Sequence, residues 1–165
     1  MSVRLLLATA DDVDALVAMN GLVQDLHADL SPQIFRRDWD RAELAQFWRA
    51  KLSEESGRVL IARAGARADA EVVGYIWMAL QARDADPLRH ERRRIYVHHI
   101  CVTTAWRGRG IGSRLLAAAD EFAREMGASS VLLDVWHENI VGRKAFERTG
   151  FTPLNLLMSR RSGLS

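Results

Sequence analysis

The feature that most constrains this chain is a basic, glycine-rich segment that lies between an apolar run and a helix-like run. The segment reads Arg107-Gly108-Arg109-Gly110-Ile111-Gly112. Glycines let the backbone turn so that several N–H groups point the same way, and a helix that begins there adds its positive end. The arginines add forked donors that suit phosphate. The segment therefore predicts a seat for a phosphate-bearing cofactor.

The composition favours a single globular domain over residues 1–165. The chain is 48% hydrophobic and 27% charged, and its formal net charge of +2 does not call for a polyanionic partner. Its one cysteine, Cys101, excludes an intramolecular disulfide and fits a reducing compartment, so we expect a cytoplasmic protein. No apolar run approaches the roughly 20 residues that cross a bilayer, so we expect no membrane partner.

The apolar periodicity predicts elements in the order β-α-α-β-β-β-α-β-α-β. A capping box at 9–12 starts the first helix, the Ser-Pro pair at 31–32 ends it, and Asp40 caps the second helix. Strands are expected over 3–8, 58–64, 71–81, 94–102, 131–136 and 151–160, a loop over 83–94, and helices after 110 and 139, with Gly127 ending the first of these two. We expect an α/β fold with a mixed, mostly antiparallel sheet of about six to seven strands and helices on both faces.

Two other phosphate-binding motifs fit the segment poorly. A dinucleotide fingerprint needs Gly-x-Gly-x-x-Gly, whereas Gly108, Gly110 and Gly112 are each separated by one residue. A Walker A loop needs Gly-Lys followed by Ser or Thr, which the segment lacks. For the segment taken alone, a solvated basic turn is the remaining alternative.

The chain resembles the GNAT N-acetyltransferase superfamily in two segments. The first is the cofactor signature Arg/Gln-x-x-Gly-x-Gly/Ala between a strand and a helix, which residues 107–112 match. The second is an Asn after the next strand, followed by a short helix and Gly-Phe, which Asn139 and Gly150-Phe151 match. The expected order of elements also resembles that of the family over nearly the whole chain.

The resemblance implies acetyl-CoA as cofactor and acetyl transfer to a primary amine of a small molecule or protein. The pantetheine arm would pair with the backbone of Ile100 and Val102, and Asn139 and Phe146 would also line the cofactor. The pyrophosphate would bind the segment that consists of Arg107, Gly108, Arg109, Gly110, Ile111, Gly112 and Ser113.

The resemblance also places catalytic groups at Tyr96 and His98. His98 is the candidate general base, because an imidazole titrates near pH 6.5; a histidine that only packs or binds substrate is the alternative. Because successive strand residues face opposite sides, His99 should pack under a helix and Cys101 should face away from His98. The two imidazoles should therefore not share a metal ion, and we expect no metal site.

Phe146 departs from the family pattern. Many members have a Tyr at this position, seven residues after the Asn, as the general acid to the CoA sulfur. Here the thiolate leaves unaided or through water, or Tyr96 or His137 replaces that Tyr. Cys101 suits this role less well, because its side chain should face away from His98. Phe146 also keeps a second function open, a non-catalytic acyl-CoA-binding sensor or scaffold.

The acceptor stays open at this stage. The resemblance places its pocket at residues 24–40 and 83–94. Acidic residues of the first segment suit an ammonium group, whereas the arginines of the second suit an anionic acceptor or draw CoA in. Nothing aromatic-rich in the basic stretches favours a nucleic-acid partner. Analogy with such folds makes a homodimer through exposed strands near the C-terminus one expectation.

Overall fold

The structure, a computed structural model, describes residues 2–67 and 69–160, which pack as two compact units. The first unit ends at Asp134 and the second begins at Val135. The described residues form five β-strands, four α-helices and two short 3-10 helices. The sheet and three of the α-helices lie in the first unit, and the fourth helix lies in the second.

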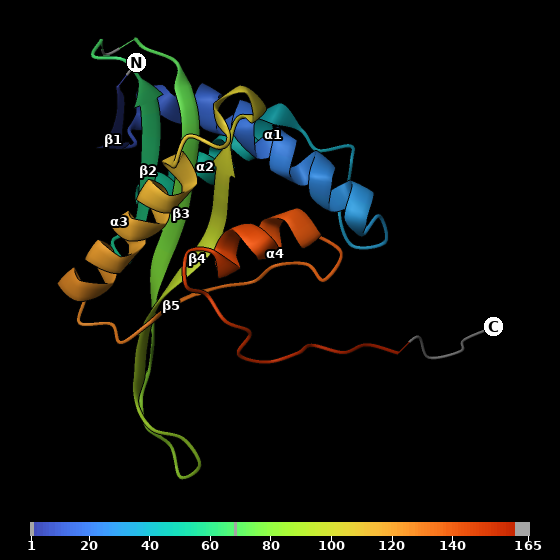
Figure 1. Ribbon diagram of the computed structural model, residues 1–165, viewed down its shortest axis with the longest axis vertical. Coiled ribbons are helices and arrows are strands. Elements are labelled where there is room, and N and C mark those ends of the chain that lie inside the picture. The colour runs from blue at the N-terminus through green and yellow to red at the C-terminus, as the bar shows by residue number, and fades with distance from the viewer. Residues whose placement is uncertain (1, 68, 161–165) are drawn as a thin grey trace. The chain divides into compact units, whose positions relative to one another are not determined.

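The five strands follow one another across the sheet in the order of the chain. They are β1 (Val3–Leu7), β2 (Gly57–Ala64), β3 (Val72–Arg83), β4 (Arg92–Val102) and β5 (Val131–Leu133). Neighbours from β1 to β4 are antiparallel, whereas β5 runs parallel to β4 (Figure 1). The sheet is therefore mixed and mostly antiparallel, as the sequence predicted.

Helices cover both faces of this sheet, as expected. Helices α1 (Val13–Leu30) and α2 (Arg41–Leu52) lie on one face, and α3 (Ile111–Glu125) lies on the other (Figure 1). Trp48 of α2 is fully buried against Tyr75 and Trp77 of β3. On the opposite face α3 packs close to Gly74, because a Cβ there would lie only 3.4 Å from side-chain atoms of both Ile111 and Leu115. We call the first of these the α1/α2 face and the second the α3 face.

The ends of the helices follow local rules that the sequence already showed. The Asp40 Oδ1 atom accepts a hydrogen bond of 2.8 Å from the N–H of Glu43 at the start of α2. Helix α1 ends at Leu30, two residues before Pro32. Gly127 adopts φ 61° directly after α3, which ends the helix in the left-handed conformation that glycine tolerates.

The prediction of six to seven strands was wrong for the described residues, because 151–160 form no strand and 134–136 do not continue β5. The apolar residues of 151–160 resemble a strand pattern, but Pro153 has no N–H to donate and no described strand pairs with the segment. The exposed strands near the C-terminus through which we expected a homodimer are therefore absent from this part of the chain.

The β3–β4 hairpin is longer than the sequence predicted. Residues 83–94 were expected to be a loop, yet Arg83 pairs with Arg92 and only 84–91 connect the strands. The connection is closed by Asp86, whose N–H donates to the Arg89 carbonyl oxygen at 2.9 Å and whose carbonyl oxygen accepts from the Arg89 N–H at 3.2 Å. Backbone pairing here outweighs the low strand propensity of a charged sequence. We call residues 80–95 the β3–β4 arm.

A buried ion pair joins the start of α1 to β2. The Asp12 carboxylate is 4% exposed, receives a hydrogen bond of 2.8 Å from the Thr9 N–H and pairs with the Arg63 guanidinium. Arg63 also donates to the Ala70 carbonyl oxygen at 2.6 Å. One guanidinium thus ties together α1, β2 and the β2–β3 turn.

Replacing Arg63 by Met should lower the free energy of unfolding by about 3–5 kcal/mol, because it leaves a buried carboxylate without its cation. Urea unfolding measures the loss. The double variant Arg63→Met/Asp12→Asn should recover part of it, since the unpaired charge is gone. If the two substitutions lowered the free energy of unfolding additively, the double variant would be less stable than Arg63→Met, and this result would contradict the account.

Candidate active site

The glycine-rich segment forms a tight connection between β4 and α3. It follows a 3-10 turn over Thr104–Trp106, and Gly108 and Gly110 both adopt φ 75°, which explains glycine at these two positions. Gly112 has an ordinary helical backbone, and a Cβ there would meet no described atom within 4 Å. The packing of the described residues therefore gives no reason for a glycine at position 112.

The N–H groups at the start of α3 are free to bind an anion. Among the described residues, the six N–H groups of 108–113 donate to no backbone or side-chain acceptor. The first N–H of the helix that does so is that of Arg114, which donates to the Gly110 carbonyl oxygen at 3.1 Å. Unpaired donors at the positive end of a helix are the arrangement that binds phosphate groups in proteins.

The arginines around this segment hold it to the sheet. The Arg107 Nε atom donates to the Val102 carbonyl oxygen at 3.0 Å, which fastens the segment to the end of β4. The Arg109 guanidinium lies over the Trp106 ring at 4.7 Å. Arg114 donates to the Val3 carbonyl oxygen at 2.9 Å and so ties α3 to β1.

Beyond the point where β5 leaves β4, no strand of the described residues pairs with that edge of β4. Strand β5 pairs only with residues 95–97 of β4. The Thr103 N–H donates to the Val73 carbonyl oxygen at 2.9 Å, and hydrogen-bonded pairs alternate along an antiparallel ladder. Residues 99 and 101 therefore bond to β3, and the backbone groups of Ile100 and Val102 point toward the opposite edge, as the predicted pantetheine contact requires.

A β-bulge at His98 changes which side chains share a face. Trp77 pairs with His99 while Met78 pairs with Val97, so His98 is an extra residue on β4. The His98 ring stacks on the Trp77 ring at 4.1 Å, and the His99 ring lies 5.7 Å from the same indole. The prediction that these two histidines face opposite sides was therefore wrong: both lie on the α1/α2 face.

The same bulge corrects two further expectations. Cys101 pairs with Tyr75 and belongs to the core of the α1/α2 face, so it shares the face of His98 instead of pointing away from it. Val102 pairs with Gly74, whose neighbours are side chains of α3, so Val102 lies on the other face. Strict alternation cannot reveal an inserted residue, and no residue type in 95–102 signals one.

The surroundings of His98 keep its imidazole neutral near pH 7. Partial burial lowers its pKa, the nearby Lys51 ammonium lowers it further, and Glu54 opposes both. The Lys51 Nζ atom lies 5.2 Å from the Trp77 ring and pairs with Glu54. A neutral imidazole on this face is able to accept a proton.

His99 is a packing residue, as expected. Burial lowers its pKa to about 4, with smaller contributions from His27 and His98. Its Nδ1 atom lies 3.3 Å from the Tyr75 hydroxyl, and its ring meets the His27 ring of α1 edge-on at 6.4 Å.

Tyr96 is held by a partner that sequence reasoning missed. Its hydroxyl donates a hydrogen bond to the Asp134 carboxylate, and its ring lies 4.9 Å from the His98 ring. Burial and Asp134 raise the pKa of Tyr96, so the hydroxyl keeps its proton. An acidic residue directly after the apolar strand 131–133 was the available signal for this pair. Trp77, which was also missed, gave no signal because a tryptophan in a strand is most often core.

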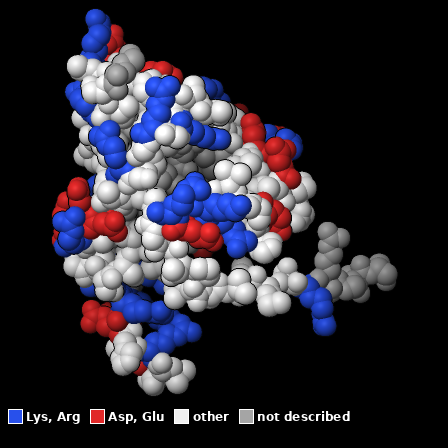
Figure 2. Space-filling view, viewed as in Figure 1, with Lys and Arg blue, Asp and Glu red and all other residues white. Residues whose placement is uncertain are grey.

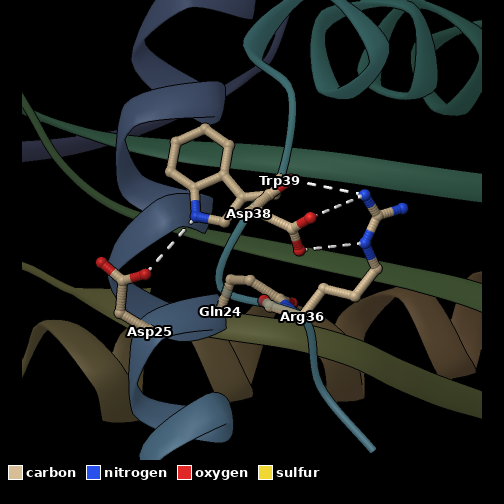
Figure 3. A network of polar contacts seen from close by, with 5 residues as sticks. All are labelled: Gln24, Asp25, Arg36, Asp38 and Trp39. Atoms are coloured by element: carbon tan, nitrogen blue, oxygen red, sulfur yellow. Dashed lines mark hydrogen bonds and ion pairs between the residues drawn. The ribbon is translucent and has the colours of Figure 1, made fainter.

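A cavity of about 360 Å³ opens beside this group of residues. It lies at the segment between α1 and α2, which α1 holds through two side chains: Gln24 donates to the Arg36 carbonyl oxygen at 2.8 Å, and the Trp39 indole donates to Asp25 at 3.4 Å (Figure 3). Phe47 lines the cavity, and its ring lies 5.3 Å from the Trp77 ring. The Trp77 ring in turn stacks on the His98 ring. The lining consists of Gln24, Ile34, Phe35, Arg36, Trp39, Asp40, Glu43, Leu44 and Phe47.

The remaining predicted site residues belong to the second unit. Helix α4 (Ile140–Glu147) starts at Asn139, whose Oδ1 atom accepts a hydrogen bond of 2.9 Å from the Gly142 N–H. Arg143 lies 3.4 Å from both the Nδ1 atom and the carbonyl oxygen of His137. The Phe146 ring contacts the Phe151 ring at 6.0 Å. Their roles toward a cofactor stay predictions.

The described residues contain neither a metal-binding cluster nor a membrane-spanning helix. No three His, Cys, Asp or Glu side chains in 2–67 and 69–160 come together in a way that could hold a metal ion. None of the helices in these ranges is both long and apolar enough to cross a membrane.

A family model that covers most of the chain identifies its family. The family described as Acetyltransferase (GNAT) matches residues 22–151. The uncharacterized N-acetyltransferase YycN of Bacillus subtilis is 31% identical over 91 residues, which cover 55% of this chain and 54% of YycN. The match thus spans about half the length of this relative.

Solved structures resemble the fold over nearly the whole chain. The tetramutant of the BH1408 protein from Bacillus halodurans has a TM-score of 0.83 at 20% identity and covers 98% of this chain and 100% of that one. The aminoglycoside N-acetyltransferase AAC(6')-Iy in complex with CoA has a TM-score of 0.74 at 15% identity and covers 98% of this chain and 95% of that one. At these identities the likeness shows the fold.

The buried His99 should make the protein less stable in acid. The unfolded state titrates it near 6.5 and the fold lowers its pKa to about 4, so its contribution is complete above pH 6.5 and is lost as the pH falls toward 4. Between about pH 7.5 and about pH 5, the free energy of unfolding of the wild type should fall by about 2 kcal/mol more than that of His99→Gln. Glutamine is chosen because its side chain keeps a hydrogen-bond partner for Tyr75. Urea unfolding at both pH values measures this; equal losses would exclude His99 as the cause.

Proposed function

This chain belongs to the acetyltransferase (GNAT) family, and on that premise we propose that it transfers an acetyl group from acetyl-CoA to a primary amine. The observation that carries the proposal is the set of six free N–H groups at residues 108–113, which lie at the start of α3 directly after the open edge of β4. An anion seat beside an unpaired strand edge suits a ligand with phosphates at one end and an amide-bearing arm at the other.

We propose that the glycine segment binds the pyrophosphate. The N–H groups of 108–113 would donate to its oxygens, with Arg107 and Arg109 adding positive charge. Gly112 supports this role, because glycine costs a helix about 1 kcal/mol relative to alanine and no described atom fills the space beside it. A phosphate that comes close to the backbone is a physical reason to keep that space clear.

The backbone of Ile100 and Val102 would pair with the amides of the pantetheine arm. This contact brings the thioester along β4 toward His98, where the bulge interrupts the ladder. Asn139 and Phe146 stay candidates for contacts to the cofactor, on the basis of the family pattern alone.

His98 is our proposed general base. The amine nitrogen attacks the thioester carbonyl carbon, the C–S bond breaks, and CoA leaves as the thiolate. The amine proton passes to the neutral His98 imidazole, directly or through water. Tyr96, whose hydroxyl keeps its proton, would position the reacting groups near His98. The leaving thiolate needs no strong acid, because a thiol has a pKa of about 8.5.

The cavity beside Phe47 is our proposed entry for the acceptor. Aromatic and aliphatic side chains line it together with Asp40, Glu43 and Arg36. The Arg36 guanidinium pairs with Asp38, so the cavity suits an amine on an apolar body. Trp77 separates it from His98 by a single ring.

A non-catalytic acyl-CoA sensor is the second candidate, and Phe146 is the residue that favours it. A phenyl ring in place of the usual Tyr has no proton to give to a leaving thiolate. Binding of CoA without acetylation across a broad panel of amines would support the sensor and exclude the transferase.

Gly110→Asp should weaken acetyl-CoA binding at least tenfold, because it adds a negative charge and a strained φ at the phosphate seat. Isothermal titration measures the affinity. Gly127→Asp is the matched control: it places the same residue at a similar φ at the far end of α3, and it should keep wild-type affinity. Wild-type protein that fails to bind acetyl-CoA below millimolar concentration would refute the cofactor proposal.

His98→Ala should lower kcat by a factor of about 10² to 10⁴ and remove the acidic limb of the pH–rate profile. Only the neutral imidazole accepts a proton, so wild-type kcat/KM should rise with pH and level off at a pKa below 6.5, where burial and Lys51 place this group. His90→Ala, on an exposed histidine of the β3–β4 arm, should leave both unchanged. A kcat that is the same in His98→Ala and the wild type from pH 6 to pH 9 would exclude His98 as the base.

A further inference from the structure

A second charged site lies at the end of β4 that is farthest from the glycine segment. There a cavity of about 460 Å³ opens on the β3–β4 arm and is lined by four arginines and no acidic residue. The lining consists of Leu80, Gln81, Ala82, Arg83, Arg89, Arg92 and Arg94. Figure 2 shows Lys and Arg side chains gathered over this arm at the bottom of the view.

The register of the hairpin places three arginines of this cavity, Arg83, Arg92 and Arg94, on the face of His98. Tyr96 pairs with Ala79, Arg94 pairs with Gln81 and Arg92 pairs with Arg83, and every second residue of a strand shares a face. Since the Tyr96 and His98 rings are in contact, Arg94 and Arg92 continue the row of side chains that begins at His98. Arg93, between them, faces the other way and donates to the Met126 carbonyl oxygen at 3.0 Å.

Most of the positive charge in this cavity is not neutralised. Asp86 pairs with Arg83 at 2.7 Å. The Arg94 Nε atom donates to the Gln81 side chain at 3.2 Å, which leaves the two outer nitrogens of that guanidinium without a partner in the part of the chain that is described. In the same ranges, Arg89 and Arg92 form no side-chain hydrogen bond, and the exposed Asp84 and Glu91 of the connection pair with none of these arginines.

The cofactor phosphates are too far away to account for these arginines. A strand rises about 3.3 Å per residue, so the eight residues from Arg94 to Val102 separate the cavity from the glycine segment by roughly 26 Å. His98 lies between the two sites. The same rise places Arg94 roughly 10–13 Å from His98, with the bulge shortening the path.

We propose that this cavity binds an anionic group of the acceptor, a carboxylate or a phosphate, which lies roughly 10–13 Å from the amine that reacts at His98. The inference rests on the proposed acetyl transfer and names its substrate class: a primary amine that carries a distant acid. Arg92 and Arg94 are the specificity residues, and the amine end is free to occupy the site beside Trp77.

The test compares three series of linear amines of increasing chain length, which differ only in the far end: ω-amino carboxylic acids, ω-amino alkyl phosphates and ω-amino alcohols. In the wild type an anionic series should have a KM about tenfold below that of the neutral series at matched length, with an optimum length and a weaker preference at high salt. The carboxylate and phosphate series show which acid is bound.

The double variant Arg92→Gln/Arg94→Gln should abolish this preference by raising KM for the anionic series, while kcat and KM for the neutral alcohols stay as in the wild type. Arg124→Gln is the control, because it removes the same charge from the last turn of α3, on the opposite face, and should keep the preference. Equal KM values for charged and neutral amines in the wild type, or a preference that survives in the double variant, would overturn the proposal.

Acetyl transfer to none of the series would count against the proposed function, and a second measurement then decides the anion site. Isothermal titration of the CoA-bound protein with the same amines should show tighter binding of the anionic series in the wild type and not in Arg92→Gln/Arg94→Gln. Equal affinities for charged and neutral amines would refute the anion site on their own.

Discussion

The extra residue in β4 is the constraint on which the arrangement of the site depends. In a regular ladder His98 and His99 would face opposite sides, and the row of side chains on the α1/α2 face would have only one of them. The bulge puts both imidazoles against Trp77, one buried beneath α1 and the other at the edge of the core. Strand β5 pairs with β4 only up to the residue before the bulge, so the open edge begins where the ladder is interrupted.

Two kinds of environment meet at this point of β4. On the side of the glycine segment, unpaired backbone donors of the described residues and a helix terminus provide positive potential. On the side of α1 and α2, aromatic rings surround His98 and keep it neutral through desolvation. A phosphate-bearing ligand is stabilised by positive potential, whereas a neutral base is stabilised by removal from water. Strand β4 provides both environments, the first at its end and the second on one of its faces.

Local chemistry made part of this molecule predictable from its sequence. Asp40, Pro32 and Gly127 act within one turn of their own helix, and all three ends lie where those residues indicated. The positive φ of Gly108 and Gly110 is likewise a property of the segment itself. The loop at 107–110 and the start of α3 therefore followed from the residues that form them.

Features that depend on distant partners did not follow. The bulge arises from the match between β3 and β4, and the Tyr96–Asp134 pair joins residues 38 positions apart. The arm is longer than its charged sequence suggests because the backbones of β3 and β4 stay paired as far as Arg83 and Arg92. Residues 151–160 show the opposite case. Their apolar pattern is typical of a strand, yet no described strand pairs with them and they form none.

The rise of β4 per residue fixes the distance between the arginines of the β3–β4 arm and His98. From Arg92 to Val97, between the end of the hairpin and the bulge, every residue of β4 pairs in register with β3. An insertion of two residues in each strand of the arm would keep every side chain on its face and move the arginines outward by about 6.6 Å. Relatives that differ only in the length of this hairpin would then differ in the length of the molecules they select, with no change at the site of reaction.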